Sequence, residues 1–447
     1  MNKDHMFSNN ALKKLLIPII IEQLLSSLIG TVDTMMVSNV GDEAMSAVSL
    51  VNSINVLVMQ AFSALATGGV IVCSQYIGKK DDEMANKAAG QLLFSVGFLS
   101  VIVMSFCLIF RTGLLGWIFG SVEEAVMENS KTYLFYTALS FPFIAVYNSG
   151  AAIFRAQGVT KMPMKISIIS NLINVCGNAI FIWVFHWEVM GVALATLISR
   201  VFSAVVVLYF LRQPKQTIVV KNYHKIRPDF RIIKTVLRIG IPSGVENSMF
   251  QLGKLMIQST VSTMGTAAIA GQAMTSTLES LQSVAASSVG VALTTVVGQC
   301  IGASRRDEAK YYVKKMSVWS WCILVTSCII VLILVRPVTI LAGMEPESAK
   351  ICVSLITTIV LVKPFIWVPS FTFVAALRAG GDVKYTMVTA IISMWICRVV
   401  LCIFLVRQFD MGPLAVWIGM FSDWTMRGIF FGTRLRSGKW LKHKVIE

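Results

Sequence analysis

The sequence is 447 residues long, 55% of its residues are hydrophobic and only 14% are charged. Soluble globular domains carry roughly 25% charged residues, so this composition excludes a soluble enzyme, a disordered protein and a disulfide scaffold. A net charge of +16 often indicates nucleic-acid binding. In a membrane protein it reflects basic cytoplasmic loops instead, and we expect no nucleic-acid partner.

Apolar runs separated by short polar connections predict an all-α integral membrane protein with twelve transmembrane helices. A helix needs about 20 apolar residues to cross the hydrocarbon core of a bilayer. Six runs of about that length or more precede a central polar stretch and six follow it. The predicted spans are 13–37, 48–76, 88–110, 130–154, 162–186, 190–212, 234–262, 268–300, 311–335, 350–378, 384–406 and 411–433.

The central polar stretch, residues 213–233, divides the chain. It predicts a cytoplasmic linker with a short surface helix before the seventh span. We therefore expect an N-terminal six-helix lobe at 1–212 and a C-terminal six-helix lobe at 234–447.

Lysine and arginine residues are distributed unevenly along these connections. With the N-terminus inside the cell, the cytoplasmic segments hold 29 of the 39 basic residues and the outer loops hold 5. Basic loops remain on the cytoplasmic side of a membrane. We therefore expect a multi-pass protein of the cell inner (plasma) membrane with both termini in the cytoplasm.

The two halves of the sequence repeat each other. The matched positions include Pro18 with Pro242, Glu22 with Glu246 and Gly78 with Gly302 at an offset of 224, and Arg155 with Arg378 and Lys161 with Lys384 at an offset of 223. Each half holds six spans, an even number, so both halves share one topology. They should be related by a pseudo-two-fold axis along the membrane normal, as in transporters that bind substrate near the membrane midplane.

Acidic side chains within spans are costly in lipid and are candidates for functional groups. Five fall within the predicted spans: Glu22, Asp33, Glu246, Glu279 and Asp423. Glu22 and Asp33 are eleven residues apart, which places both on one face of the first helix. The alternative for each acid is a structural ion pair with a basic residue. Asp423 lies four residues before Arg427 and favours this second interpretation.

Two amides and a hydroxyl offer further polar groups inside the first lobe. Asn174 and Asn178 are four residues apart and share a face of span five, and Thr196 on span six could join them. A carboxylate with amide and hydroxyl oxygens suits Na⁺, whereas a carboxylate alone suffices for a proton. Interhelical hydrogen bonding is the structural alternative for the two amides.

Motifs of ATP-driven and enzymatic membrane proteins are missing from the sequence. No GxxxxGK[ST] segment occurs, all four histidines lie outside the membrane core, and there is no HExxH. We therefore expect a secondary active transporter and not an enzyme. It should have no catalytic residues, no cofactor, and no metal site beyond a coupling Na⁺ at Asp33, with Na⁺ or H⁺ as the coupling ion.

Several segments resemble the multidrug and toxic compound extrusion (MATE) family, especially its bacterial members. The resemblance is carried by IPIIIEQLLSSLIGTVDTMMVSNVG (17–41), SQYIGKKD (74–81), ALSFPFIAVYNSGAAIFRAQG (138–158), NLINVCGNAIFI (171–182), GVALATLISR (191–200), TTVVGQCIGA (294–303) and RLRSGKW (434–440). It implies twelve spans in two lobes and export of organic cations against Na⁺ or H⁺ influx.

The resemblance also implies site residues. The cation site of the family's first lobe falls on Asp33, Asn174, Asn178 and Thr196, and a functional glutamate on span seven falls on Glu246. Position 178 is Asn where many members have Asp, which leaves both Na⁺ and H⁺ open as the coupling ion.

A substrate or second cation site is expected at three glutamates: Glu246, Glu279 and Glu22. The chain is thus expected to act as a secondary active antiporter that exports organic cations or drugs in exchange for Na⁺ or H⁺, by alternating access between two lobes. We expect a monomer whose partners are small organic cations and the lipid bilayer. The alternative is a lipid-linked oligosaccharide or lipid flippase of the same superfold. It ranks second because only five basic residues lie in the spans.

Overall fold

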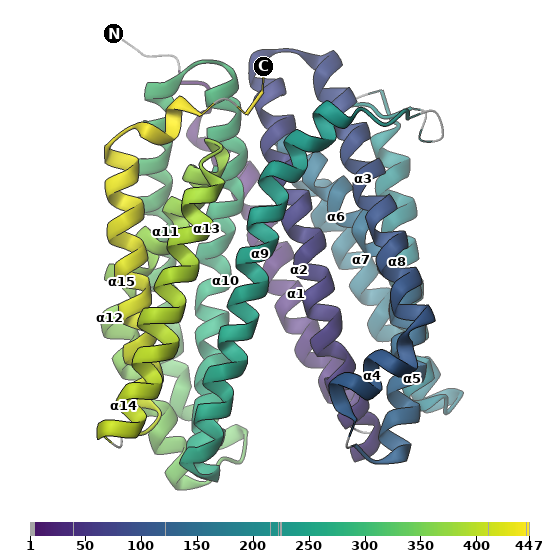
Figure 1. Cartoon of the computed structure of the whole chain (residues 1–447), viewed down its shortest axis with the longest axis vertical. Coiled ribbons are helices and arrows are strands. Elements are labelled where there is room, and N and C mark those ends of the chain that lie inside the picture. The colour runs from purple at the N-terminus through teal and green to yellow at the C-terminus, as the bar shows by residue number, and fades with distance from the viewer. Residues whose placement is uncertain are drawn as a thin grey trace. The chain divides into compact units, whose positions relative to one another are not determined.

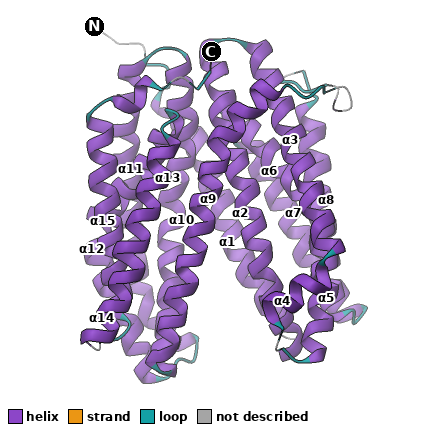
Figure 2. Ribbon diagram, in the orientation of Figure 1, coloured by secondary structure: helices purple, strands orange, loops and turns teal. Residues whose placement is uncertain are grey.

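A computed structural model of the chain is built from α-helices joined by short connections (Figures 1 and 2). It describes residues 5–38, 40–120, 122–214, 216–221, 223, 226–409, 411–443 and 445–446. The side chains of 28–35 and 38 lie outside the described residues. No β-strand occurs within these ranges.

The helices follow the predicted spans, whose ends lie within six residues of the observed ends. In the first half they are α1 (Asn9–Ser38), α2 (Asp42–Lys79), α3 (Asp82–Ile109), α4 (Arg111–Phe119), α5 (Glu124–Leu139), α6 (Phe141–Ala156), α7 (Lys161–Ala179) with the π-helical turn η1 (Ile180–Val184), and α8 (Glu188–Leu211). In the second half they are α9 (Phe230–Val261), α10 (Thr266–Gly302), α11 (Arg306–Leu341), α12 (Pro346–Ala379), α13 (Val383–Ser393) with the π-helical segment η4 (Met394–Val400) and α14 (Leu401–Phe409), and α15 (Leu414–Arg436).

Most of these helices are long and apolar enough to cross a membrane. Within the described residues, 8 helices meet that condition, and the bent pair of α5 and α6 makes 9. The remaining predicted spans correspond to α1, α9 and α15, which have 30, 32 and 23 residues. Each predicted span therefore corresponds to a helix or to consecutive helical segments.

The fourth predicted span is broken in its middle. α5 and α6 meet at 42°, and Pro142 is the second residue of α6. Proline has no backbone N–H to donate to the preceding turn, so a helix starts readily at this position but does not run through it. The short helix α4 was not predicted, since its nine residues were assigned to an outer loop.

The chain forms two compact units. Lys13–Gly244 is called the N-terminal unit, and Val245–Glu447 with Met1–Leu12 is called the C-terminal unit. The chain start joins the second half because the backbone N–H groups of Met6 and Phe7 donate to Glu308 and Tyr312, at 2.9 and 2.8 Å. The first residues of α9 join the N-terminal unit, where a Cβ on Gly68 of α2 would lie 2.6 Å from the carbonyl oxygen of Val236.

The linker between the halves is attached to α3. The backbone N–H of Val219 donates to Asn86 Oδ1 at 2.7 Å, and the backbone N–H of Asp229 donates to Gln91 Oε1 at 3.0 Å. Lys87 Nζ lies 2.6 Å from Asp229 Oδ2. Among the described linker residues, only 230–233 are α-helical, and they form the start of α9, so no separate surface helix is found there. Backbone groups of the linker bind side chains of α3 instead.

Candidate functional site

The N-terminal unit brings three of the predicted site residues onto two adjoining helices. Asn174 and Asn178 lie one turn apart on α7, and both are buried. Thr196 lies on α8, and its Oγ1 accepts a hydrogen bond from Asn174 Nδ2 at 3.3 Å. Asp33 lies on α1, and its side chain lies outside the described residues. The structure thus places amide and hydroxyl groups together, in the pattern that the sequence predicted.

Close packing of α7 against α8 sets this contact. A Cβ on Gly177 would lie 2.9 Å from the Cβ of Ala195, so only glycine allows the two helices to approach this closely. Ser170 Oγ also donates to the carbonyl oxygen of Ser199 at 3.0 Å. Directly after these residues the helix widens into the π-helical turn η1. Such turns occur frequently at functional sites.

Arg200 continues the polar face of α8 and was not among the predicted site residues. It lies one turn after Thr196, and its Nη1 donates to Ser140 Oγ at 2.7 Å. Its Nη2 lies 3.5 Å from Met59 Sδ on α2. Ser140 stands at the break between α5 and α6. Arg200 therefore connects α8 with α2 and with the break between α5 and α6. Its position as a basic residue inside a predicted span could have identified it as a candidate site residue.

Two of the predicted glutamates form repeat-related ion pairs. In the N-terminal unit, Arg155 Nη2 lies 2.6 Å from Glu22 Oε1. In the C-terminal unit, Arg378 Nη2 lies 2.6 Å from Glu246 Oε2. The sequence repeat already matched the two glutamates and the two arginines, but it did not predict that each glutamate contacts its arginine. Both glutamates are mostly buried, so each arginine compensates a charge that would be costly alone.

The third predicted glutamate also contacts a basic residue. Glu279 Oε1 on α10 lies 2.7 Å from Nζ of Lys363, a fully buried residue of α12. The same ammonium donates to Ser283 Oγ at 2.7 Å and lies 3.3 Å from Gln282 Oε1. The carbonyl oxygen of Glu279, at 3.2 Å, is a fourth acceptor, so the hydrogen-bonding capacity of this ammonium is satisfied inside the unit.

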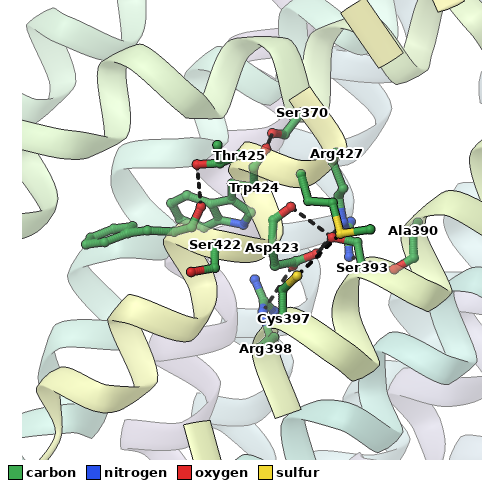
Figure 3. Close-up of polar contacts among 12 residues, drawn as sticks. Ser370, Ala390, Ser393, Cys397, Arg398, Ser422, Asp423, Trp424, Thr425 and Arg427 are labelled. Atoms are coloured by element: carbon green, nitrogen blue, oxygen red, sulfur yellow. Dashed lines mark hydrogen bonds and ion pairs between the residues drawn. The ribbon is translucent and has the colours of Figure 1, made fainter. Parts of the chain in front are cut away.

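A second charged cluster surrounds Asp423 in the C-terminal unit (Figure 3). Arg427 Nε lies 2.7 Å from its Oδ1, and Arg398 Nε lies 3.3 Å from its Oδ2. Ser393 Oγ donates to Oδ1 at 2.6 Å. The predicted contact between Asp423 and Arg427 is present, but it is buried and not on a helix surface. Arg398 comes from η4, which the sequence did not connect with Asp423.

Phe250 on α9 extends this cluster with its aromatic face. The guanidinium carbons of Arg398 and Arg427 lie 4.8 and 5.5 Å from its ring centroid, and Lys254 Nζ lies 5.2 Å away. Such stacking favours cations near the ring. Lys363, Arg398 and Arg427 are buried and Lys254 is exposed, so four basic side chains stand near the carboxylates of Glu279 and Asp423 and give this part of the C-terminal unit an excess of positive charge.

The same helix contact carries different chemistry in the two units. Ser393 Oγ donates to the carbonyl oxygen of Asp423 at 2.9 Å, as Ser170 Oγ donates to that of Ser199. Ser199 and Asp423 therefore occupy equivalent positions. One turn before them along the helix stand Thr196 in one unit and Met420 in the other. The first unit thus presents neutral oxygens where the second presents a thioether beside charged groups.

The sequence also matches known proteins. The profile of the family MatE matches residues 18–180 and again 242–404, two copies at the spacing of the internal repeat. The probable multidrug resistance protein NorM of Thermotoga maritima is 28% identical over 440 residues, covering 97% of this chain and 93% of that protein. The uncharacterized transporter YisQ of Bacillus subtilis is 27% identical over 459 residues, covering 98% of this chain and 99% of that protein.

The fold is likewise similar to a solved structure. A multidrug resistance MATE family transporter of the MOP superfamily, solved in an outward-facing conformation, superimposes with a TM-score of 0.90 at 20% sequence identity. The alignment covers 97% of this chain and 96% of that chain. This agreement confirms the predicted fold class of twelve membrane-spanning helices in two six-helix lobes. The chain belongs to the MatE family and is a membrane transporter, not an enzyme.

Proposed function

We propose that this chain is a secondary active antiporter that exports organic cations or drugs in exchange for Na⁺ or H⁺. Its family and the multidrug resistance name of its Thermotoga relative support export of drug-like molecules. The observation that carries the coupling step is the partly buried contact between Asn174 and Thr196. The names of the relatives do not favour a lipid or oligosaccharide flippase.

The proposed coupling site consists of Asp33 with the oxygens of Asn174, Asn178 and Thr196. The amide and hydroxyl groups carry no charge, so a cation bound there is neutralised by Asp33 alone. Na⁺ would use the neutral oxygens as additional ligands, whereas H⁺ would need only the carboxylate. Exchange results when the ion stabilises one conformation and the exported substrate stabilises another.

We propose that Glu22, Glu246 and Glu279 serve as the substrate or second cation site. In the structure Glu22 contacts Arg155, Glu246 contacts Arg378, and Glu279 contacts Lys363. A cationic substrate would therefore have to compete with that arginine or lysine for the carboxylate.

The proposed orientation places the more basic ends of the helices, and both termini, in the cytoplasm. This proposal rests on the uneven distribution of lysine and arginine between the two sets of connections. The inner (plasma) membrane is the proposed location. We propose that a monomer suffices, because one chain supplies both repeated halves.

Efflux of ethidium from cells tests the proposal. Cells would express the wild type, Asp33→Asn, or the control Asp42→Asn, whose carboxylate is exposed at the start of α2. Membrane abundance would be matched, and the Na⁺ and pH gradients would be collapsed separately. We expect efflux to be lost in Asp33→Asn, kept in Asp42→Asn, and abolished by collapse of one gradient, which identifies the ion. Efflux that is indifferent to Asp33→Asn and to both gradients would contradict antiport.

A further inference from the structure

A long groove runs along the side of the C-terminal unit. α12 packs against both α11 and α15, and these three helices line a cavity of about 1180 Å³. Its lining is mostly apolar and aromatic, and includes Trp321, Phe365 and Phe373. Gly428 and Gly432 on α15 leave the groove open, because neither has a side chain to fill it.

One end of the groove is basic. Lys310 and Lys314 of α11 and Arg436 of α15 line it there, and all three are exposed. Lys310 Nζ lies 3.6 Å from Asp307. Lys314 and Arg436 make no ion pair with any described residue. This end carries the basic residues that the proposed orientation places in the cytoplasm, so it would lie at the inner surface of the membrane.

Two buried hydrogen-bond donors on residues that line the groove lack a partner among the described residues. Ser317 Oγ is one, on a residue 9% exposed, and Trp424 Nε1 is the other, on a residue 2% exposed. Both residues line the groove. Ser317 lies about 4.5 Å along α11 from Lys314, and Trp424 lies about 18 Å along α15 from Arg436, at 1.5 Å per residue. Both donor atoms are covered by protein atoms in this structure, so a ligand with acceptor oxygens would pair with them only after these side chains turn toward the groove.

We propose that this groove binds one anionic phospholipid from the cytoplasmic leaflet. The phosphate would contact Lys314 and Arg436, and an acyl chain would lie along Phe365 and the two glycines. Basic pockets between membrane helices on the cytoplasmic side favour anionic headgroups. This inference rests on the proposed orientation and does not depend on the exported substrate.

A second copy of the chain fits this groove less well than a lipid. A symmetric dimer through this face would bring the same basic ends together, and like charges repel. The first half also lacks the basic residues of α11, since the repeat matches Lys310 with Asn86 and Lys314 with Gly90. The charge of Lys310 and Lys314 is therefore a feature of this one groove, whereas Arg436 has a counterpart, Arg212, in the first half.

Quenching of Trp321 fluorescence by brominated lipids tests the proposal directly. Trp321 lines the groove and is 43% exposed. The full chain would be reconstituted into phosphatidylcholine vesicles that contain brominated phosphatidylglycerol or brominated phosphatidylcholine. The difference between the wild type and Trp321→Phe isolates the signal of this tryptophan. We expect the anionic lipid to quench this signal at a lower mole fraction than the zwitterionic lipid does.

Two sets of variants then separate charge from shape. Lys314→Gln with Arg436→Gln should reduce the preference for the anionic lipid by roughly tenfold, given the attraction of each basic residue to an anionic surface. The matched control, Lys161→Gln with Lys165→Gln, removes two exposed basic residues of α7 and should leave the preference unchanged. Gly432→Leu should weaken quenching by both lipids, because a Cβ there meets only Phe373, at 3.8 Å, and the longer side chain would fill the groove.

Three outcomes would overturn the proposal. Equal quenching by both lipids, unchanged in the Lys314 and Arg436 variant, would mean nonspecific lipid contact. An equal loss of preference in the α7 control would mean a general surface-charge effect. Absence of quenching, with cross-linking between copies through Val318→Cys, would mean that a second copy covers the groove. Thermal stability of each variant, measured in the same vesicles, shows whether it is folded.

Discussion

Asn174 and its neighbour Asn171 allow the coupling site to be tested at the scale of single residues. Both lie on α7, but Asn174 Nδ2 donates to Thr196 Oγ1, whereas Asn171 Nδ2 donates to Ser167 Oγ on its own helix. Asn174→Ala should raise the ion concentration for half-maximal transport by about tenfold, the loss expected for one interaction of about 1.4 kcal/mol. Asn171→Ala should leave it unchanged. Equal effects of the two variants would contradict a specific role of Asn174.

The Lys363 and Glu279 pair gives a second prediction at this scale. Removal of one partner leaves an uncompensated buried charge and typically costs about 3–5 kcal/mol. Lys363→Gln should therefore lower the thermal unfolding midpoint of the protein in detergent. The double variant Lys363→Gln, Glu279→Gln should recover most of that loss, because no lone charge remains. A double variant no more stable than Lys363→Gln would show that the pair does not act as a unit.

The sequence identified the acidic residues within the spans, but it did not identify most of their contacts. Glu22, Glu246 and Glu279 were chosen because acids within spans are costly, and the structure shows a basic partner for each. Among the contacts of the acidic residues, only that between Asp423 and Arg427 was predictable, because it lies within about one helix turn. The other partners come from distant helices, and single-sequence periodicity contains no information on which helix faces which.

At the scale of elements, the close approach of α7 and α8 controls the geometry of the amide cluster. Gly177→Ala would place a Cβ 2.9 Å from that of Ala195. Overpacking of this kind costs typically about 1–3 kcal/mol. We expect a lower unfolding midpoint and slower transport in Gly177→Ala, and recovery of both in Gly177→Ala with Ala195→Gly.

Gly97→Ala on α3 is the matched control for this substitution. A Cβ on Gly97 meets nothing within 4 Å. Alanine is favoured over glycine inside a helix by roughly 0.5–1 kcal/mol, so this variant should be neutral or slightly stabilised. An equal loss of stability in both variants would contradict the claim that close packing of α7 against α8 causes the loss in Gly177→Ala.

The linker contact predicts a dependence on pH. The hydrogen bond from Lys87 lowers the pKa of Asp229 below its ordinary 3.8. The charged carboxylate is therefore favoured in the folded chain. The contact contributes stability above the ordinary pKa and loses it as the pH falls through the lowered value. Amide exchange of Ile218 and Val219, corrected for its intrinsic rate, should be constant near neutral pH and rise only below pH 3.8.

Asp229→Asn should remove this dependence and raise the exchange at neutral pH. The control Asp82→Asn, at an exposed position at the start of α3, should behave as the wild type. Exchange that rises equally with falling pH in wild type and Asp229→Asn would contradict the role of this ion pair.

Helix boundaries were predictable to within six residues because apolar length is fixed by bilayer thickness. The break at Ser140 and the short helix α4 were harder to predict. α4 begins with Arg111 and has only nine residues, too few for a span, so hydropathy alone assigned it to a loop. The π-helical segments η1 and η4 depend on local packing, and no residue pattern marked them in advance.

At the scale of the whole molecule, duplication explains what the two units share and substitution explains how they differ. Both units keep the glutamate and arginine pair, and both keep a serine that donates to the neighbouring helix. The first unit then presents neutral amides and a hydroxyl, whereas the second carries the Asp423 cluster. This asymmetry assigns ion coupling to the first unit in our proposal.

The most direct test of this account is ion flux in vesicles that contain only the purified protein. Addition of an organic cation on one side should drive Na⁺ or H⁺ across the membrane in the opposite direction, at a rate that depends on the substrate concentration. Wild type should show this flux for one of the two ions, and Asp33→Asn should show none while remaining folded. Substrate transport without any ion movement, or coupled flux that persists in Asp33→Asn, would contradict the account.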